Sequence, residues 1–246
     1  MERESTHIMT WRLHICFSLW LALRLAAAPV SGRIELRDSK DPAVRKGADY
    51  SGVVVWLQPI PPLVANSRTN VTARIDQKNK TFLPHILAIE AGTRVTFPNS
   101  DPIFHSAFSN YNGETFDIGL YPPGKSKNVR FSQPGVVRVF CNIHPEMSAV
   151  IVVLDTPYYS TTKKDGTFRI ENVPAGEYRL RVFHERATEE TLSALARVIR
   201  VGNEPQVAPP IAISESGYLA VPHKNKYGHD YHTPPNEGGT YPVVRP

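Results

Sequence analysis

The chain has 246 residues and a formal net charge of +5, enough for one large domain or two small ones with tails. Its basic residues are spread along the sequence without a dense Lys/Arg cluster, which argues against nucleic-acid binding. With 22 prolines and 15 glycines between many short apolar runs, the composition favours β-structure with frequent turns over helical bundles.

The first 28 residues have the layout of a secretory signal peptide. Arg12 precedes the apolar stretch 15–28, which ends in three alanines, and cleavage is expected near Ala27 or Ala28. The stretch is short for a membrane span, although an uncleaved N-terminal anchor is the alternative, and Met9 is an alternative start. We therefore expect a periplasmic or secreted bacterial protein without a membrane span after cleavage. Cys16 lies in the removed segment, which leaves Cys141 as a lone cysteine and excludes a disulfide within the mature chain.

Short strands dominate the remaining predicted elements. Residues 32–36 and 51–57 are predicted strands, the second containing the apolar run 53–57, and a polar connection over 38–50 separates them. Regularly spaced apolar segments then predict a β-sandwich or barrel, at 86–90, 94–97, 103–108, 127–131, 135–140 and 147–154.

Residues 158–214 have a different pattern. The turn signal Asp165-Gly166 leads into alternating strands at 167–170 and 178–182, followed by a short helix or loop over 188–196 and a strand at 198–201. Residues 215–246 contain many Pro, Gly, Tyr and His without apolar periodicity. This composition predicts an extended or loosely ordered tail.

The most informative stretch is the loop 141–147, which carries a thiolate, an imidazole and a thioether in Cys141, His144 and Met147. His105 lies upstream and provides a second imidazole. Two imidazoles, one thiolate and a weak thioether are the ligand set of a copper electron-transfer centre, whereas zinc prefers more thiolates or a carboxylate. Each residue alone is ordinarily a packing or surface residue. Together they predict one copper ion, cycling between Cu(I) and Cu(II), with these four residues as ligands.

Residues 82–84 and 92–97, with Asn99, Asp101 and His105, resemble the first half of the cupredoxins, the small blue copper proteins such as amicyanin and plastocyanin. The loop 141–147 resembles the short ligand loop of amicyanins. The resemblance covers residues 74–155, about a third of the chain, and the mature region as a whole resembles bacterial methylamine-utilisation and plastocyanin-like proteins.

This resemblance implies a Greek-key β-sandwich that holds type 1 copper and carries single electrons without being an enzyme. His105, Cys141 and His144 would be the strong ligands and Met147 the axial one. A periplasmic redox partner protein would exchange electrons through a partly exposed His144, beside an apolar patch around Pro145. Two positions depart from the family pattern without removing a ligand. Ser106 stands where asparagine is frequent, and Phe140 where tyrosine is frequent.

Residues 165–180 resemble the carboxypeptidase regulatory-like modules, which are small transthyretin-like β-sandwiches, and this implies a scaffolding or docking role. Such modules begin with strands like 32–36 and 53–57. One hypothesis is therefore that the copper domain is inserted into a split sandwich made of 32–60 and 158–214. The predicted organisation is all-β, with a signal peptide (1–28), an N-terminal β segment (32–60), a copper domain (70–157), a second sandwich (158–214) and a tail (215–246).

Other functions remain open at this point. A copper-handling protein without redox cycling is the main alternative, although the chain has only three methionines. A multi-copper enzyme would generally carry His-x-His pairs, which the sequence lacks. His85 is expected on the surface, with a place near the copper as the alternative, and His184 is expected to be structural. His223, His229 and His232 are expected to be solvated tail residues.

Overall fold

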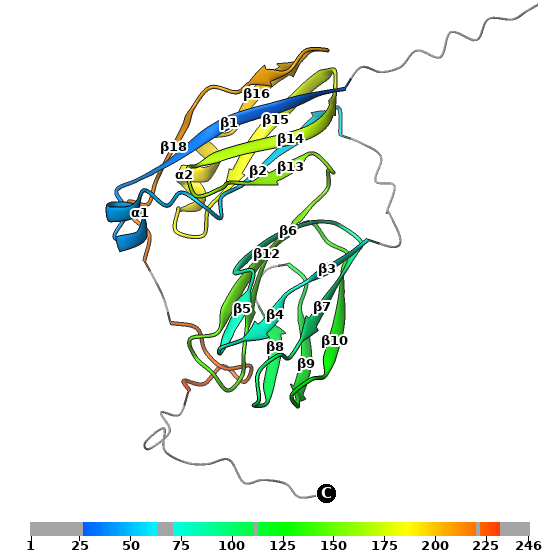
Figure 1. Ribbon diagram of the computed structural model, residues 1–246, viewed down its shortest axis with the longest axis vertical. Helices are drawn as coiled ribbons and strands as arrows, with labels where there is room; N and C mark the ends of the chain where they lie inside the picture. The colour runs from blue at the N-terminus through cyan, green and yellow to red at the C-terminus, as the bar shows by residue number, and fades with distance from the viewer. Residues whose placement is uncertain (1–26, 63–70, 111–112, 220–221, 232–246) are drawn as a thin grey trace, which may run out of the picture.

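The computed structural model describes residues 27–62, 71–110, 113–219 and 222–231. They form two β-sandwiches, one above the other in Figure 1, so the predicted all-β class is confirmed. We call residues 71–154 the inserted sandwich, and residues 27–60 with 159–214 the companion sandwich. No helix in the described ranges has the length and apolar character needed to cross a membrane.

The companion sandwich combines strands from both ends of the chain. In one sheet the central strand β1 pairs with three others, and the members are β1 (Ala27–Arg37), β14 (Thr167–Pro174), β17 (Gln206–Val207) and β18 (Ile211–Ser214). The facing sheet has the order β13 (Tyr159–Thr161), β2 (Val54–Ile60), β15 (Gly176–Phe183) and β16 (Arg197–Val201). Because β2 pairs antiparallel with β13 and β15, the companion sandwich is interrupted along the chain by the inserted one.

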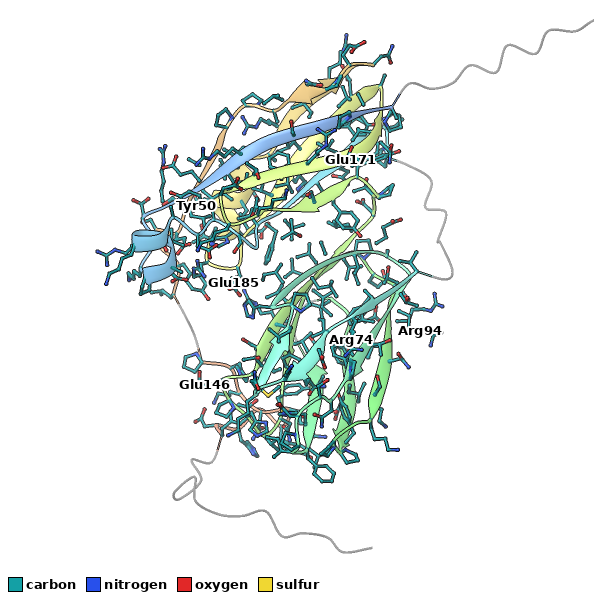
Figure 2. All side chains as sticks on the ribbon, viewed as in Figure 1. Tyr50, Arg74, Arg94, Glu146, Glu171 and Glu185 are labelled. Atoms are coloured by element: carbon teal, nitrogen blue, oxygen red, sulfur yellow. The ribbon has the colours of Figure 1, made fainter. Side chains whose placement is uncertain are left out.

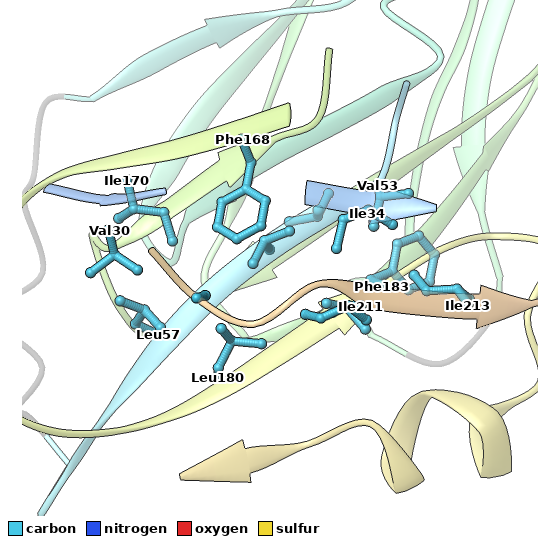
Figure 3. Close-up of a cluster of buried hydrophobic side chains, with 14 of the residues drawn as sticks. Val30, Ile34, Val53, Leu57, Phe168, Ile170, Leu180, Phe183, Ile211 and Ile213 are labelled. Carbon is cyan, nitrogen blue, oxygen red and sulfur yellow. The ribbon is translucent and has the colours of Figure 1, made fainter. Parts of the chain in front are cut away.

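Alternating apolar residues build the companion core. Leu57 on β2 lies opposite Leu180 on β15 in register, and both are fully buried. Figure 3 shows these two side chains facing Ile34 and Ile170 from the other sheet. The period of two that marked these strands in the sequence thus places one face of each strand in this core.

Several elements differ in extent from the sequence-based expectation. β1 runs from Ala27 rather than from residue 32, because its first residues pair with the end of β14, where Ala28 lies opposite Val173. The predicted signal peptide otherwise lies outside the described residues. The polar connection 38–50 contains a helix, α1 (Pro42–Gly47), which the sequence analysis missed although Asp41 caps its first turn by accepting a hydrogen bond from Ala43 N. The helix or loop expected at 188–196 contains α2 (Glu189–Ala194).

The inserted sandwich consists of two facing sheets and one hairpin. The smaller sheet has the order β10 (Ser126–Phe131), β7 (Thr93–Pro98) and β3 (Thr72–Arg74). The larger sheet has the order β6 (Ile86–Glu90), β12 (Ser148–Leu154), β11 (Gly135–Phe140), β8 (His105–Ser109) and β9 (Phe116–Tyr121). The hairpin is formed by β4 (Asp76–Lys78) and β5 (Thr81–Leu83).

Strand β12 contributes to both hydrophobic cores. Its odd-numbered residues, such as Ile151, are buried in the core of the inserted sandwich, and its even-numbered residues, such as Val152, are buried in the cluster of the companion sandwich. Both faces of β12 are therefore shielded from water, which explains why the sequence of this strand is a continuous apolar run instead of an alternating one. The two sandwiches are packed together through this strand.

Residues 222–231, part of the tail predicted to be extended or loosely ordered, form no helix or strand but make defined contacts with the rest of the chain. This segment, orange to red in Figure 1, lies against the end of the inserted sandwich that is far from the companion. These contacts are made through backbone carbonyls and aromatic rings, so no apolar periodicity in the sequence predicts them.

Candidate metal centre

Two paired strands and one loop bring three of the predicted ligands together. His105 begins β8, Cys141 follows the last residue of β11, and His144 lies in the loop that leads into β12. β8 and β11 pair antiparallel with Phe140 opposite Phe108, so the chain that continues beyond Phe140 runs alongside β8 toward His105. This pairing sets Cys141 next to His105 although 36 residues separate them along the chain.

The ligand atoms form a small, buried triangle. The Nδ1 atoms of His105 and His144 lie 3.1 Å apart, and Cys141 Sγ lies 4.0 Å and 3.6 Å from them, respectively. A point equidistant from the three atoms lies about 2 Å from each, which is close to the length of metal–nitrogen and metal–sulfur bonds in proteins. The three donors therefore fit one metal ion. Within the described ranges they are the one group of His, Cys, Asp and Glu residues arranged in this way.

Met147 closes the loop that carries two of these ligands. Cys141 N donates a hydrogen bond to Met147 O at 3.2 Å, and Met147 N donates one to His144 O at 3.1 Å. The Met147 side chain is fully buried in the same core as Cys141. The fourth predicted ligand thus lies at the base of the loop, in the interior of the inserted sandwich.

Asp101 fixes the ring of His105 from the side opposite the triangle. Its Oδ2 accepts a hydrogen bond from His105 Nε2 at 2.8 Å and another from Lys80 N at 2.8 Å, and its Oδ1 accepts one from Asn79 N at 2.6 Å. Asn79 and Lys80 form the turn of the β4–β5 hairpin, where both have positive φ angles. With Nε2 donating to a carboxylate, Nδ1 of His105 is left free to bind a metal. Asp101 belongs to the sequence resemblance without this role, for which its four-residue spacing to His105 is the available signal.

Ser106, next to His105 on β8, contacts both Cys141 and the residue that follows it. Its Oγ lies 3.7 Å from Cys141 Sγ and accepts a hydrogen bond from Asn142 N at 2.8 Å. The backbone N–H of Ser106 also donates to the Cys141 sulfur. The serine therefore ties the ligand loop to β8 and places a donor on the thiolate.

The surroundings of Cys141 favour its thiolate form. Burial alone raises the pKa of this thiol, but hydrogen bonds from His105, His144 and two backbone N–H groups outweigh it and lower the pKa to about 5. For His105 burial lowers the pKa, and the contacts with Cys141 and Asp101 reverse this and raise it. In the metal-free protein these contacts thus favour a negative charge on the Cys141 sulfur.

The expected partial exposure of His144 is not observed. The residue is 9% exposed, and its Nε2 is buried without a hydrogen-bond partner among the described residues. The neighbouring Pro145 and Glu146 are exposed, and Figure 2 shows Glu146 beside the C-terminal segment. Ile143, on the other side of His144, is exposed as well, so solvent reaches the loop at these three residues.

The remaining histidines lie outside the triangle. The acceptors Ser148 O and Glu185 Oε2 lie 3.0 Å and 2.8 Å from the ring nitrogens of His85, so this residue belongs to the contact between the sandwiches. His184 is buried against Glu215 at 2.9 Å, in keeping with a structural role. His223 contacts the ligand loop, contrary to its predicted solvated state, whereas His229 is exposed and His232 lies outside the described residues.

No family model and no curated protein matches the chain. A purple cupredoxin from Nitrosopumilus maritimus is similar over 33% of this chain and 99% of its own, with 26% identity and a TM-score of 0.30. Amicyanin from Paracoccus versutus is similar over 42% of this chain and 98% of its own, with 16% identity and a TM-score of 0.32. A copper-containing nitrite reductase from Thermus scotoductus is similar over 49% of this chain but 28% of its own, with 23% identity and a TM-score of 0.33. The solved structures that this chain resembles over part of its length thus include cupredoxins, the family to which its ligand loop is similar.

Proposed function

We propose that this protein is an exported mononuclear copper protein that carries one electron at a time. The observation that supports this most directly is the buried triangle of two imidazole nitrogens and one thiolate sulfur, with a buried methionine at the base of the same loop. In this proposal His105, Cys141 and His144 are the strong ligands and Met147 is the weak one. Such a His₂Cys set with a distant thioether is typical of blue copper sites, and copper, when bound, supplies the one-electron chemistry.

The fold holds these ligands in fixed positions and excludes water from them. Asp101 orients His105, Ser106 ties the loop to β8, and the backbone of Met147 closes the loop. Ligands that are fixed by the fold need little rearrangement between the two oxidation states. This rigidity supports an electron carrier over a copper store, from which the metal must leave easily.

Burial also supports a carrier over an enzyme. His105 and Cys141 are fully buried, and His144 is nearly so. An electron can cross a thin protein layer, whereas a substrate needs an open coordination position. We further propose that a redox partner protein binds near the exposed Pro145, and that the N-terminal 28 residues direct the protein to the periplasm or outside the cell.

The test is a visible absorption spectrum of the protein after addition of Cu(II). We expect an intense Cu–thiolate band, its loss in Cys141→Ser and its retention in the matched Cys16→Ser variant. Cyclic voltammetry of the loaded protein should then give a reversible one-electron couple. A folded protein without the band would refute the proposed site. A band without reversible redox behaviour would instead favour copper handling.

A further inference from the structure

The loop that carries Cys141 and His144 is covered from outside by a segment from the far end of the sequence. Residues 222–231, which we call the strap, follow the companion sandwich along the chain and return to the opposite end of the inserted sandwich (Figure 1). Tyr231 Oη donates a hydrogen bond of 2.7 Å to the carbonyl oxygen of Cys141, and Lys226 N donates one of 3.0 Å to Asn142 Oδ1. The strap therefore contacts the backbone of a proposed ligand and the side chain of the next residue.

A third contact lies at the other side of the loop. His223 Nε2 donates a hydrogen bond of 2.6 Å to Pro145 O, and its ring stacks on Phe140 with 4.0 Å between ring centroids and 22° between planes. Tyr231 Oη lies 3.2 Å from His223 Nδ1, so the two anchors also contact each other. Together the anchors touch the loop directly before Cys141, at Cys141 itself and directly after His144.

The strap has its own internal structure between these anchors. Asn225 Oδ1 accepts hydrogen bonds from Tyr227 N and His229 N, and Asn225 N donates to His229 O at 2.9 Å. Gly228 has a φ of 78°, which the tight turn requires and which glycine adopts without strain. A self-bonded turn loses less conformational entropy on docking than an open chain would, which favours a stable strap.

Charge and protonation agree with this placement. Lys226 Nζ forms an ion pair of 2.7 Å with Asp117, so the strap is also fastened to β9. Burial raises the pKa of Tyr231, with a further contribution from the nearby Cys141 charge, so its hydroxyl stays protonated and able to donate.

We propose that the strap is part of the metal site, with Tyr231, His223 and Lys226 as positioning residues that hold the ligand loop and restrict access to Cys141. This inference rests on the proposed function, because it assigns positioning residues to the proposed copper site. The contacts themselves require no metal. A tail without this role would be expected to leave the reactivity of the cysteine unchanged when its anchors are removed.

The first experiment measures thiol reactivity in the metal-free full-length chain, with Cys16→Ser as background so that Cys141 is the sole thiol. The variant Tyr231→Phe/His223→Ala removes two anchors, and His229→Ala is the matched control, since this exposed histidine lies in the strap without touching the loop. Two hydrogen bonds lost should speed the reaction with a disulfide reagent by about tenfold or more, with the control close to the parent. An unchanged rate in the double variant would overturn the inference. If circular dichroism shows the double variant to be misfolded, Tyr231→Phe alone decides, with an expected increase of about fivefold.

The second experiment separates this inference from the proposed function. Copper-loaded parent, double variant and control are mixed with a chelator, and decay of the visible band is followed. Faster copper loss and a shifted band in the double variant alone support the strap as part of the site. A parent protein without any band counts against the proposed function, while the thiol experiment still decides the strap. If the parent has a normal band and the double variant matches it in band position, rate of copper loss and rate of thiol reaction, the proposed role of the strap is refuted and the proposed function stands.

Discussion

Replacing Asp101 with asparagine tests whether one buried carboxylate organises both the β4–β5 hairpin and His105. Its two oxygens accept three hydrogen bonds of 2.6–2.8 Å, from Asn79 N, Lys80 N and His105 Nε2. An amide has nearly the same shape but accepts at one oxygen only, so at least one donor loses its acceptor. A hydrogen bond to a charged group contributes about 1.5–3 kcal/mol. We therefore expect the free energy of unfolding to fall by about 2 kcal/mol, or about 4–8 °C in Tm for a chain of this length.

Urea unfolding of the metal-free protein measures this change in the free energy of unfolding. A competition titration measures the copper affinity, which should fall by about 10- to 100-fold because His105 loses its orienting partner. Asp76→Asn is the matched control. This carboxylate pairs with Arg74 and accepts from Ser100 Oγ at the surface, so its loss should cost only about 0.5 kcal/mol and leave copper affinity unchanged. Equal destabilisation by both substitutions, together with an unaltered copper affinity in Asp101→Asn, would refute the reasoning.

Two further predictions concern the contact between the sandwiches. Val152→Ala removes two buried methyl groups from the face of β12 that packs on the companion sandwich. It should lower the free energy of unfolding by about 2 kcal/mol without changing the copper band. A loss of stability no larger than that of the exposed control Val198→Ala would contradict this prediction. Glu185 raises the pKa of His85 through their hydrogen bond, so the stability gained from this pair is complete below about pH 6.5 and is lost as pH rises through the folded pKa of His85. We compare the free energy of unfolding of the parent and of His85→Asn by urea unfolding at pH 6 and pH 9. Because the His85 side chain is 45% exposed, the stability lost in the variant should be larger at pH 6 than at pH 9 by only about 0.5 kcal/mol. An equal loss at both pH values would contradict a stabilising His85–Glu185 pair.

The candidate ligands were predictable because their signal is local. Cys141, His144 and Met147 lie within seven consecutive residues, and a loop between two strands has few ways to arrange them. His105 had to be inferred from distant sequence, and its place depends on the pairing of β8 with β11. Asp101 was harder still, because its role depends on the hairpin turn at Asn79 that reaches it from another part of the fold.

Other features could not be predicted from periodicity. The apolar run in β12 indicates burial on both faces, but it does not reveal that the second face packs on another sandwich. Helix α1 is only six residues long and has a single buried residue, Val44, so it lacks an apolar stripe. In the strap, polar and aromatic residues dock through hydrogen bonds to Cys141 O and Pro145 O, and such contacts leave no pattern in the sequence.

The order of the strands also governs how the protein would respond to proteolysis. The chain passes between the two sandwiches three times, between β2 and β3, between β12 and β13, and between β18 and the strap. A single peptide-bond break in any one of these crossings leaves the sandwiches covalently joined through the others. Release of the inserted sandwich therefore requires a cut in each of the first two crossings, because within the described ranges no strand of one sandwich pairs with a strand of the other, and a molecule cut once keeps its two sandwiches together.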